Sequence, residues 1–256
     1  MMDNMKLMDV IAILGALAWL PQILSWIYKW LRRPEVSIFH DSESEVGCIK
    51  NGCAFNVRLS FLSRKKHALI DDIQLLLTDK NGASHTLKWI WHSETLYELL
   101  GPEGNATMSK QQNAIAINAY EDALIEKFVG FQSVEFIEER KRLSYLLQTF
   151  IENQKSGGCL KVDQVKASKE YNDLVRLYKS CFLWKSGEYN CILKVHIADI
   201  NQIVEHKFKF VLSDIEEDAL RKNLDIARVA IDCEFVDPAS PITSTWLWAK
   251  PSIVSK

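Results

Sequence analysis

The chain has 256 residues, a formal net charge of −2 at pH 7 and 48% hydrophobic residues, which is an ordinary composition for a globular protein. This charge gives no reason to expect a nucleic-acid partner, and ten glycines and six prolines are too few for long disordered linkers. The length is sufficient for one large domain or two small ones that fold without disulfide bonds.

An uncharged, mostly apolar stretch runs from Val10 to Tyr28, and Lys29, Arg32 and Arg33 follow it. A helix that crosses a bilayer needs roughly 20 apolar residues, so this stretch predicts a membrane anchor. The residues that define the anchor are Val10, Ile13, Leu14, Leu17, Trp19, Leu20, Pro21, Leu24 and Ile27. Because the basic residues gather on its C-terminal side, the positive-inside rule places the rest of the chain in the cytoplasm, at an inner or plasma membrane.

Three other interpretations of the stretch stay open. A cleaved signal peptide would use Ala16 and Ala18 as the small residues of its cleavage site, although the apolar run continues past them. A helix lying in the membrane plane would place Gln22, Ser25 and Lys29 on a polar face. A helix packed on the core of its own domain is the third interpretation.

The chain after Pro34 predicts a first group of strands. Residues 35–39 suggest a short strand, and residues 54–61 alternate between apolar and polar side chains with the period of two that a half-buried strand shows. Residues 73–77 and 85–89 repeat this alternation on either side of the Asn-Gly turn at 79–82, which is a strong hairpin signal. A loop is expected at 101–104 and another strand at 113–118.

From Tyr120 the apolar residues recur at three- and four-residue spacings, which predicts helices. Gly130 is a candidate break between two of them, and Gly157-Gly158 ends the run. A further helix is expected over residues 168–178, so that a helical insert covers about residues 120–182.

Strands resume over residues 189–197 and 208–212, and the turn at 199–202 joins them into a second hairpin. Ser213 and Glu216 have the spacing of a capping box, in which each side chain bonds the backbone N–H of the other. A helix is therefore expected over residues 214–229, and the three prolines after Asp237 predict an irregular tail.

The order of these elements predicts an α+β fold: an N-terminal transmembrane helix, then a mainly antiparallel, sandwich-like β-domain with inserted and C-terminal helices. The expected plan is an anchor with its basic flank at 1–33, a soluble β-rich domain at 34–236 and an irregular tail at 237–256.

The common catalytic motifs are absent from the sequence. It contains no GxxxxGK[ST] phosphate loop, GxSxG serine turn, HExxH helix or CxxC pair. Cys48 and Cys53 lie near His40 and His67 in the sequence, but structural zinc sites use two close ligand pairs, so neither a metal nor a cofactor is expected. In a cytoplasmic domain the six cysteines are expected to be reduced thiols.

These features favour a single-pass membrane protein whose soluble domain is an interaction or scaffolding module. Its expected partners are membrane lipid and either another protein or further copies of the same chain. One alternative is a membrane-perturbing effector that oligomerises through its anchor on sensing a signal, because Gly15-Ala16 permits close helix approach. A third class is an enzyme whose site is composed of distant residues.

Overall fold

A computed structural model describes residues 18–28, 31–101, 104–156, 161–237 and 245–255 of the chain. Residues 18–28 form an N-terminal helix. The remaining elements are β1 (Glu35–Ile49), β2 (Gly52–Arg64), β3 (Ala68–Thr78), β4 (Ser84–Gly101), β5 (Gly104–Asn113), β6 (Ile117–Ala119), β7 (Leu124–Gln132), α2 (Val134–Ser156), α3 (Val162–Ala167), α4 (Lys169–Ser180), β8 (Gly187–Ile197), the 3₁₀ turn η1 (Ala198–Ile200), β9 (Gln202–Leu212), α5 (Asp214–Arg221), α6 (Asn223–Ile231), the π-helical turn η2 (Asp232–Val236), β10 (Trp248–Ala249) and β11 (Ile253–Ser255).

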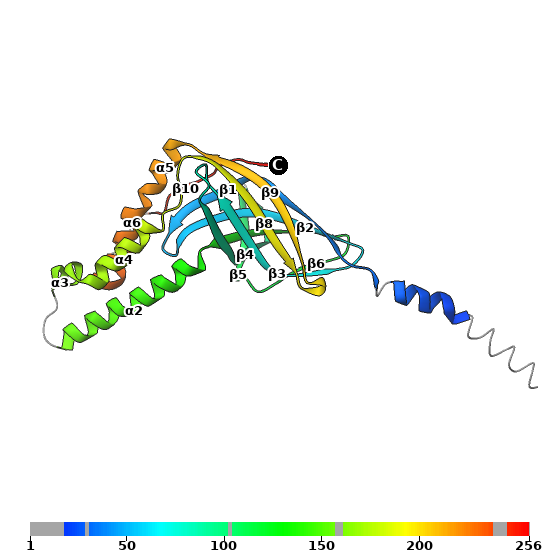
Figure 1. The fold of residues 1–256 in the computed structure, drawn as a ribbon, viewed down its shortest axis with the longest axis horizontal. Coiled ribbons are helices and arrows are strands. Elements are labelled where there is room, and N and C mark those ends of the chain that lie inside the picture. The colour runs from blue at the N-terminus through cyan, green and yellow to red at the C-terminus, as the bar shows by residue number, and fades with distance from the viewer. Residues whose placement is uncertain (1–17, 29–30, 102–103, 157–160, 238–244, 256) are drawn as a thin grey trace, which may run out of the picture.

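The strands form one antiparallel sheet, which confirms the mainly antiparallel α+β prediction in its coarse form. Within the described residues the sheet has 11 strands, and its main path is β10-β1-β2-β7-β4-β3-β8-β9-β11, with β5 paired to β4 and β6 to β3. It curls into a half-barrel whose strands run along the body in Figure 1. The apolar faces of two sheets would meet in a sandwich, whereas here one sheet covers its own apolar face by curling.

Aromatic rings from distant strands meet inside the curled sheet. The ring of Phe55 on β2 lies 5.5 Å from that of Phe210 on β9 and 6.4 Å from that of Phe131 on β7. Trp184, which precedes β8, is also fully buried and packs edge-on against Tyr189 at 5.9 Å. Large rings remove much apolar surface from water, so this aromatic centre is a major part of the core.

The C-terminal segment joins the two edges of the sheet. Ala249 on β10 pairs with Val46 on β1, Ser252 bridges to Glu43, and Ile253 on β11 pairs with Phe210 on β9. The prediction of an irregular tail is therefore wrong for residues 248–249 and 253–255, because pairing with β1 and β9 overrides the weak local strand signal of this proline-containing segment.

A lobe of helices lies at one end of the half-barrel, away from the N-terminal helix (Figure 1). Its separate apolar core includes Phe136, Leu147, Leu174 and Ile231. The predicted capping box is confirmed: Glu216 N–H donates to Ser213 Oγ at 3.3 Å, and Ser213 N–H donates to Glu216 Oε2 at 2.8 Å. The single helix predicted over residues 214–229 is divided into α5 and α6.

The predicted helical start at Tyr120 is wrong, because residues 124–132 form β7 between β2 and β4. Helix α2 begins only after Ser133, whose Oγ accepts the N–H of Phe136 at 3.1 Å. Gly130 does not break a helix but makes room for an indole ring, since a Cβ there would lie 2.2 Å from Trp91 Cε2.

Both predicted hairpins are present. Thr78 pairs with Ser84 in the first and Ile197 with Gln202 in the second. The first turn depends on an acidic residue: Asp79 Oδ1 accepts the N–H groups of Asn81 at 2.8 Å and Ala83 at 2.9 Å. The bond from the Ala83 N–H is the largest influence that lowers the pKa of Asp79, the bond from the Asn81 N–H adds to it, and partial burial opposes both.

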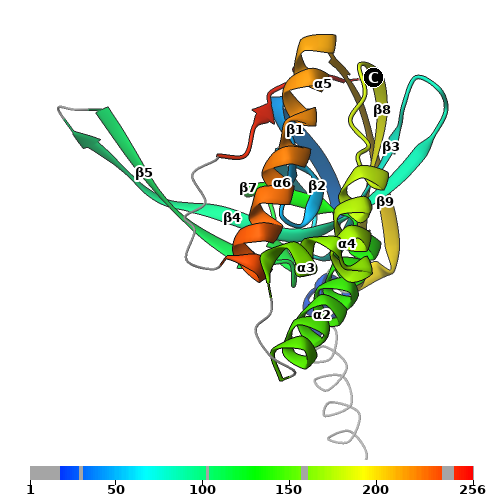
Figure 2. The ribbon, with the colours of Figure 1, turned by 90° about the vertical axis from the view of Figure 1, so that its left-hand side faces the viewer.

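The distal parts of β4 and β5 form a two-stranded arm. The segment predicted as a loop at 101–104 joins these strands, with Gly101 opposite Gly104. Figure 2 shows the arm extending sideways from the body. β5 pairs with β4 alone in the described part of the sheet, so the outer edge of the arm presents backbone groups without a neighbouring strand.

Replacing Gly130 with alanine tests the close approach of Trp91. The added methyl group must displace the indole, so we expect Gly130→Ala to lower the free energy of unfolding by about 1–3 kcal/mol, as overpacking does. Chemical denaturation of the same substitution in a Trp91→Leu background is the control, and there the cost should shrink. An equal cost in both backgrounds would contradict the packing described.

Candidate functional site

Three kinds of feature in the described residues are candidates for function: the exposed N-terminal helix, a polar group inside the half-barrel and a hollow on its outer face. Of the residues predicted to form an anchor, Val10, Ile13, Leu14 and Leu17 lie outside the described residues, and so does the basic residue Lys29. Trp19, Leu20, Pro21, Leu24 and Ile27 lie on the N-terminal helix, and Arg32 and Arg33 follow it.

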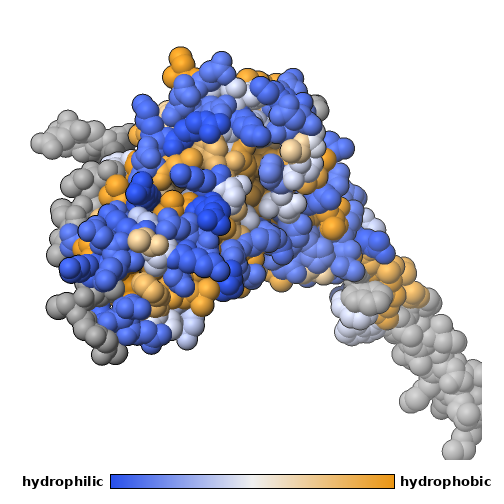
Figure 3. All heavy atoms as spheres, turned by 60° about the vertical axis from the view of Figure 1, so that its left-hand side comes forward, coloured by the Kyte–Doolittle hydropathy of each residue, from blue (hydrophilic) through white to orange (hydrophobic). Residues whose placement is uncertain are grey.

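The N-terminal helix leaves its apolar side chains in water. Trp19 is 64% exposed, Leu24 58% and Trp26 68%, and Figure 3 shows orange, apolar atoms where the helix leaves the mostly hydrophilic body. The helix is therefore not packed on the core. Within the described residues, no helix combines the length and apolar character that crossing a membrane requires.

The end of this helix is tied to the body by charge. Arg32 Nη1 lies 3.9 Å from Glu121 Oε1 in the turn before β7, and the guanidinium lies 5.6 Å from the centre of the Tyr28 ring. The ion pair is partly exposed, so its contribution to stability is small. It nevertheless shows which end of the sheet the helix leaves.

The polar group consists of His92 and Lys127, which are buried inside the half-barrel, and Glu94, whose side chain is 47% exposed and also lines the outer hollow. Lys127 Nζ lies 2.9 Å from Glu94 Oε1, and the Lys127 side chain is 10% exposed. His92 is 5% exposed, and its Nδ1 is buried without a hydrogen-bond partner in the described structure. Burial first, and then the charge of Lys127, lower the pKa of His92, whereas Glu94 opposes the shift. His92 is therefore held as the neutral imidazole.

The hollow lies on the outer face of β1, β2, β7 and the base of the arm. Its larger part, about 430 Å³, is lined by Glu45, Arg58, Ser93, Glu94, Ser109, Glu126 and Phe128, and an adjoining part of about 190 Å³ adds Asp41, Glu43, Ser44 and Lys250. Arg58 Nη1 donates to Glu126 Oε1 at 2.6 Å. Carboxylates outnumber bases in this lining, but acidic character alone does not identify a ligand.

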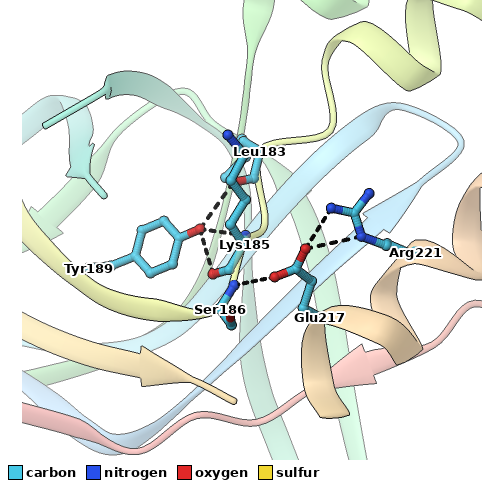
Figure 4. Close-up of polar contacts among 6 residues, drawn as sticks. All are labelled: Leu183, Lys185, Ser186, Tyr189, Glu217 and Arg221. Carbon is cyan, nitrogen blue, oxygen red and sulfur yellow. Dashed lines mark hydrogen bonds and ion pairs between the residues drawn. The ribbon is translucent and has the colours of Figure 1, made fainter. Parts of the chain in front are cut away.

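A further polar cluster at the helical end of the sheet has a structural role. Tyr189 Oη accepts the N–H of Lys185 at 2.7 Å and lies 3.0 Å from the carbonyls of Leu183 and Lys185 (Figure 4). Glu217 accepts the N–H of Ser186 and pairs with Arg221 at 2.6 Å. Burial raises the pKa of Tyr189 to about 12. These bonds fix the segment before β8 and occupy the Tyr189 hydroxyl and the Glu217 carboxylate.

Cys48 and Cys53 do not form a zinc site with the histidines that lie near them in the sequence. Cys48 and Cys53 pair across the β1–β2 turn with their Sγ atoms 3.5 Å apart, whereas His40 Nε2 lies 3.1 Å from Ser255 Oγ. None of the five described cysteines is in a disulfide, and the described residues contain no cluster of three His, Cys, Asp or Glu side chains suited to a metal. Burial and the neighbouring Cys48 raise the pKa of Cys53, which makes this thiol a poor nucleophile.

Comparisons with known proteins assign no family to the chain. No family model matches it, and no curated protein matches it either. Among solved structures, it is similar to a family 123 glycoside hydrolase from Clostridium perfringens that was studied for glycolipid glycan hydrolysis, with 8% sequence identity and a TM-score of 0.33. The similarity covers 71% of this chain and 27% of the hydrolase. A likeness of this size carries no argument about activity.

The neutral state of His92 gives the stability of the protein a pH dependence. Its pKa is lower in the folded than in the unfolded chain, where it lies near the usual value of about 6.5, so protons bind preferentially to the unfolded chain as the pH falls through that value. We expect His92→Gln to lose less unfolding free energy than the wild type between pH 8 and pH 5, measured by chemical denaturation. The control is His67→Gln, an exposed histidine, and a His92→Gln profile parallel to the wild type would contradict this account.

Proposed function

We propose that this protein is attached to a membrane through its N-terminal apolar stretch and that its β-rich body binds a partner protein. The exposed N-terminal helix is the observation that carries the proposal. Full burial of one Leu, Ile or Phe side chain is worth about 1.5–3 kcal/mol, and eight large apolar residues between Trp19 and Leu31 are exposed. A bilayer would bury them together, whereas the body of the protein leaves them in water.

The apolar stretch that begins at Val10 is long enough in sequence to span a bilayer, and a single-pass anchor is the form of attachment we propose. Arg32 and Arg33 support a cytoplasmic body, because basic residues are retained on that side.

The arm supports the second half of the proposal. An isolated two-stranded ribbon is only marginally stable in water, and an open strand edge is a template for pairing with another chain. β5 offers such an edge along Gly104–Asn113. A partner that adds a strand there would cover backbone groups that the chain itself leaves uncovered.

Flotation with phosphatidylcholine vesicles tests the attachment. We expect the full-length wild type to float with the vesicles and Leu24→Glu/Ile27→Glu to bind at least about tenfold more weakly, because a charge in an apolar bilayer is costly. The matched control is Ile215→Glu/Val254→Glu, which places the same two acids at exposed apolar positions of the body. Equal flotation of the anchor variant and the wild type would contradict attachment through this helix.

Shortening the arm tests partner binding. Replacing residues 96–108 with Asn-Gly would close the hairpin at the pair Thr95–Ser109. We expect the shortened protein to stay in the membrane fraction and to lose the proteins that co-purify with the full-length chain after detergent solubilisation, as measured by quantitative mass spectrometry. Recovery of the full-length chain alone, or of the same proteins with both chains, would contradict a partner-binding arm.

A further inference from the structure

Two histidines face each other across the line where the half-barrel closes. His40 on β1 and His206 on β9 have ring centres 5.0 Å apart, and the ring planes are tilted by 57°. Their cross-strand neighbours are Leu59 and Leu193, which are fully buried in the core. Because cross-strand partners point to the same face of a sheet, both rings lie on the inward face.

The pair lies beside the end of the segment that closes the half-barrel. Ser255, the last residue of β11, pairs with Phe208 on β9, and its Oγ lies 3.1 Å from His40 Nε2. The ring of His40 also lies 5.3 Å from that of Phe208. A group that linked the two histidines would therefore hold β1 and β9 together at the end of β11.

The hydrogen bonds of His40 determine which of its nitrogens can bind a ligand. Nδ1 lies 2.7 Å from the carbonyl oxygen of Asp41. A carbonyl only accepts, so Nδ1 carries the hydrogen, and Nε2 of the neutral ring carries the lone pair. The Ser255 hydroxyl donates to this lone pair, and a hydroxyl rotates easily to another acceptor. Metal-binding histidines commonly donate their second ring nitrogen to a carbonyl in this way.

His206 has a ring nitrogen without a partner. Its Nε2 is buried and forms no hydrogen bond within the described structure. Such an atom is costly in a native fold, and a water or an ion is a usual explanation for it. Burial first, and then the neighbouring His40, lower the pKa of His206. The ring is therefore neutral at pH 7, which is the form that binds a metal ion.

The bases next to the pair project from the other face of the sheet. Successive residues of a strand point to opposite faces, so Lys207 and Lys209 on β9 and Arg58 on β2 lie outside. Each has a carboxylate partner: Glu205 for Lys207 at 3.9 Å, Glu188 for Lys209 at 2.9 Å and Glu126 for Arg58 at 2.6 Å. These positive charges therefore do not enter the space between the rings.

The separation of the rings fits an ion held between them. Two imidazoles bound tetrahedrally, with Zn–N bonds of about 2.0–2.1 Å, have ring centres about 5 Å apart, and the observed separation is 5.0 Å. Imidazole is a ligand that suits Zn²⁺, Cu²⁺ and Ni²⁺. Both rings are only half-buried, so water can reach the remaining coordination positions.

We propose that His40 and His206 bind a divalent transition-metal ion such as Zn²⁺, and that this ion ties β1 to β9 beside the end of β11. Water and the adjacent Ser255 hydroxyl are available for the other coordination positions. Structural zinc sites use four protein ligands, so two nitrogens give a weaker site. The ion therefore reinforces a half-barrel that the C-terminal segment already closes.

Calorimetric titration of the full-length protein in detergent with Zn²⁺ tests the site. We expect one ion to bind per chain at pH 7.5 and His206→Phe to weaken binding at least about tenfold, because phenylalanine keeps a ring beside Phe208 but has no nitrogen ligand. His40→Phe should have the same effect. The control is His196→Phe, which removes a histidine from the outer face of β8 and should leave the affinity unchanged.

Hydrogen exchange of the wild type locates the bound ion. With Zn²⁺ we expect the amides of Ile253–Ser255 to exchange about tenfold more slowly than without it, because the ion holds both neighbouring strands in place. Mg²⁺, which prefers oxygen ligands, should have no such effect. The proposal would be overturned by a wild type that does not bind Zn²⁺, by binding that persists in both His206→Phe and His40→Phe, or by binding that leaves these amides unprotected.

Discussion

Most of the inward face of the sheet is apolar, and it leaves water only if the sheet curls and its edges are held together. The C-terminal segment meets this constraint by pairing with β1 through Val46–Ala249 and with β9 through Phe210–Ile253. Asn223 secures the approach of that segment, because its amide accepts the N–H of Leu247 at 2.8 Å and donates to the carbonyl of the same residue at 2.7 Å. The half-barrel thereby completes its core without the N-terminal helix, and among the described residues no part of the body covers the apolar side chains of that helix.

The sequence predicted the elements whose signals are local. β2 and both hairpins follow from period-two alternation and turn chemistry, and α5 from the capping box at Ser213. β7 was missed because its apolar residues, spaced three and four apart, continue into α2 without interruption. Two local signs were available: Ser133 caps the true helix, and Gly130 is a poor helix residue placed where Trp91 approaches the backbone. The closing strands could not be predicted, since two or three residues become a strand only when long-range partners are present.

The candidate sites also differ in whether the sequence alone predicts them. The apolar stretch before Lys29 can be predicted from the sequence, because hydrophobicity and charge asymmetry are properties of a continuous segment. The open edge of β5 cannot be predicted in this way, since only the sheet topology shows that β5 pairs with β4 alone among the described strands. The group of His92, Lys127 and Glu94 is equally hidden, because the burial of its two nitrogen bases depends on the curl of the sheet.

The positions of the helix and the arm have a joint geometric consequence. The helix leaves the body at one end of its long axis, whereas the arm leaves the side of the body (Figures 1 and 2). A body that stood on a bilayer at the end that carries the helix would hold the arm alongside the membrane rather than away from it. Confinement to one surface raises the effective concentration of neighbours that share it. A strand edge presented in that direction would therefore meet partners held at the same membrane, including further copies of this chain, more often than proteins dissolved in the surrounding water.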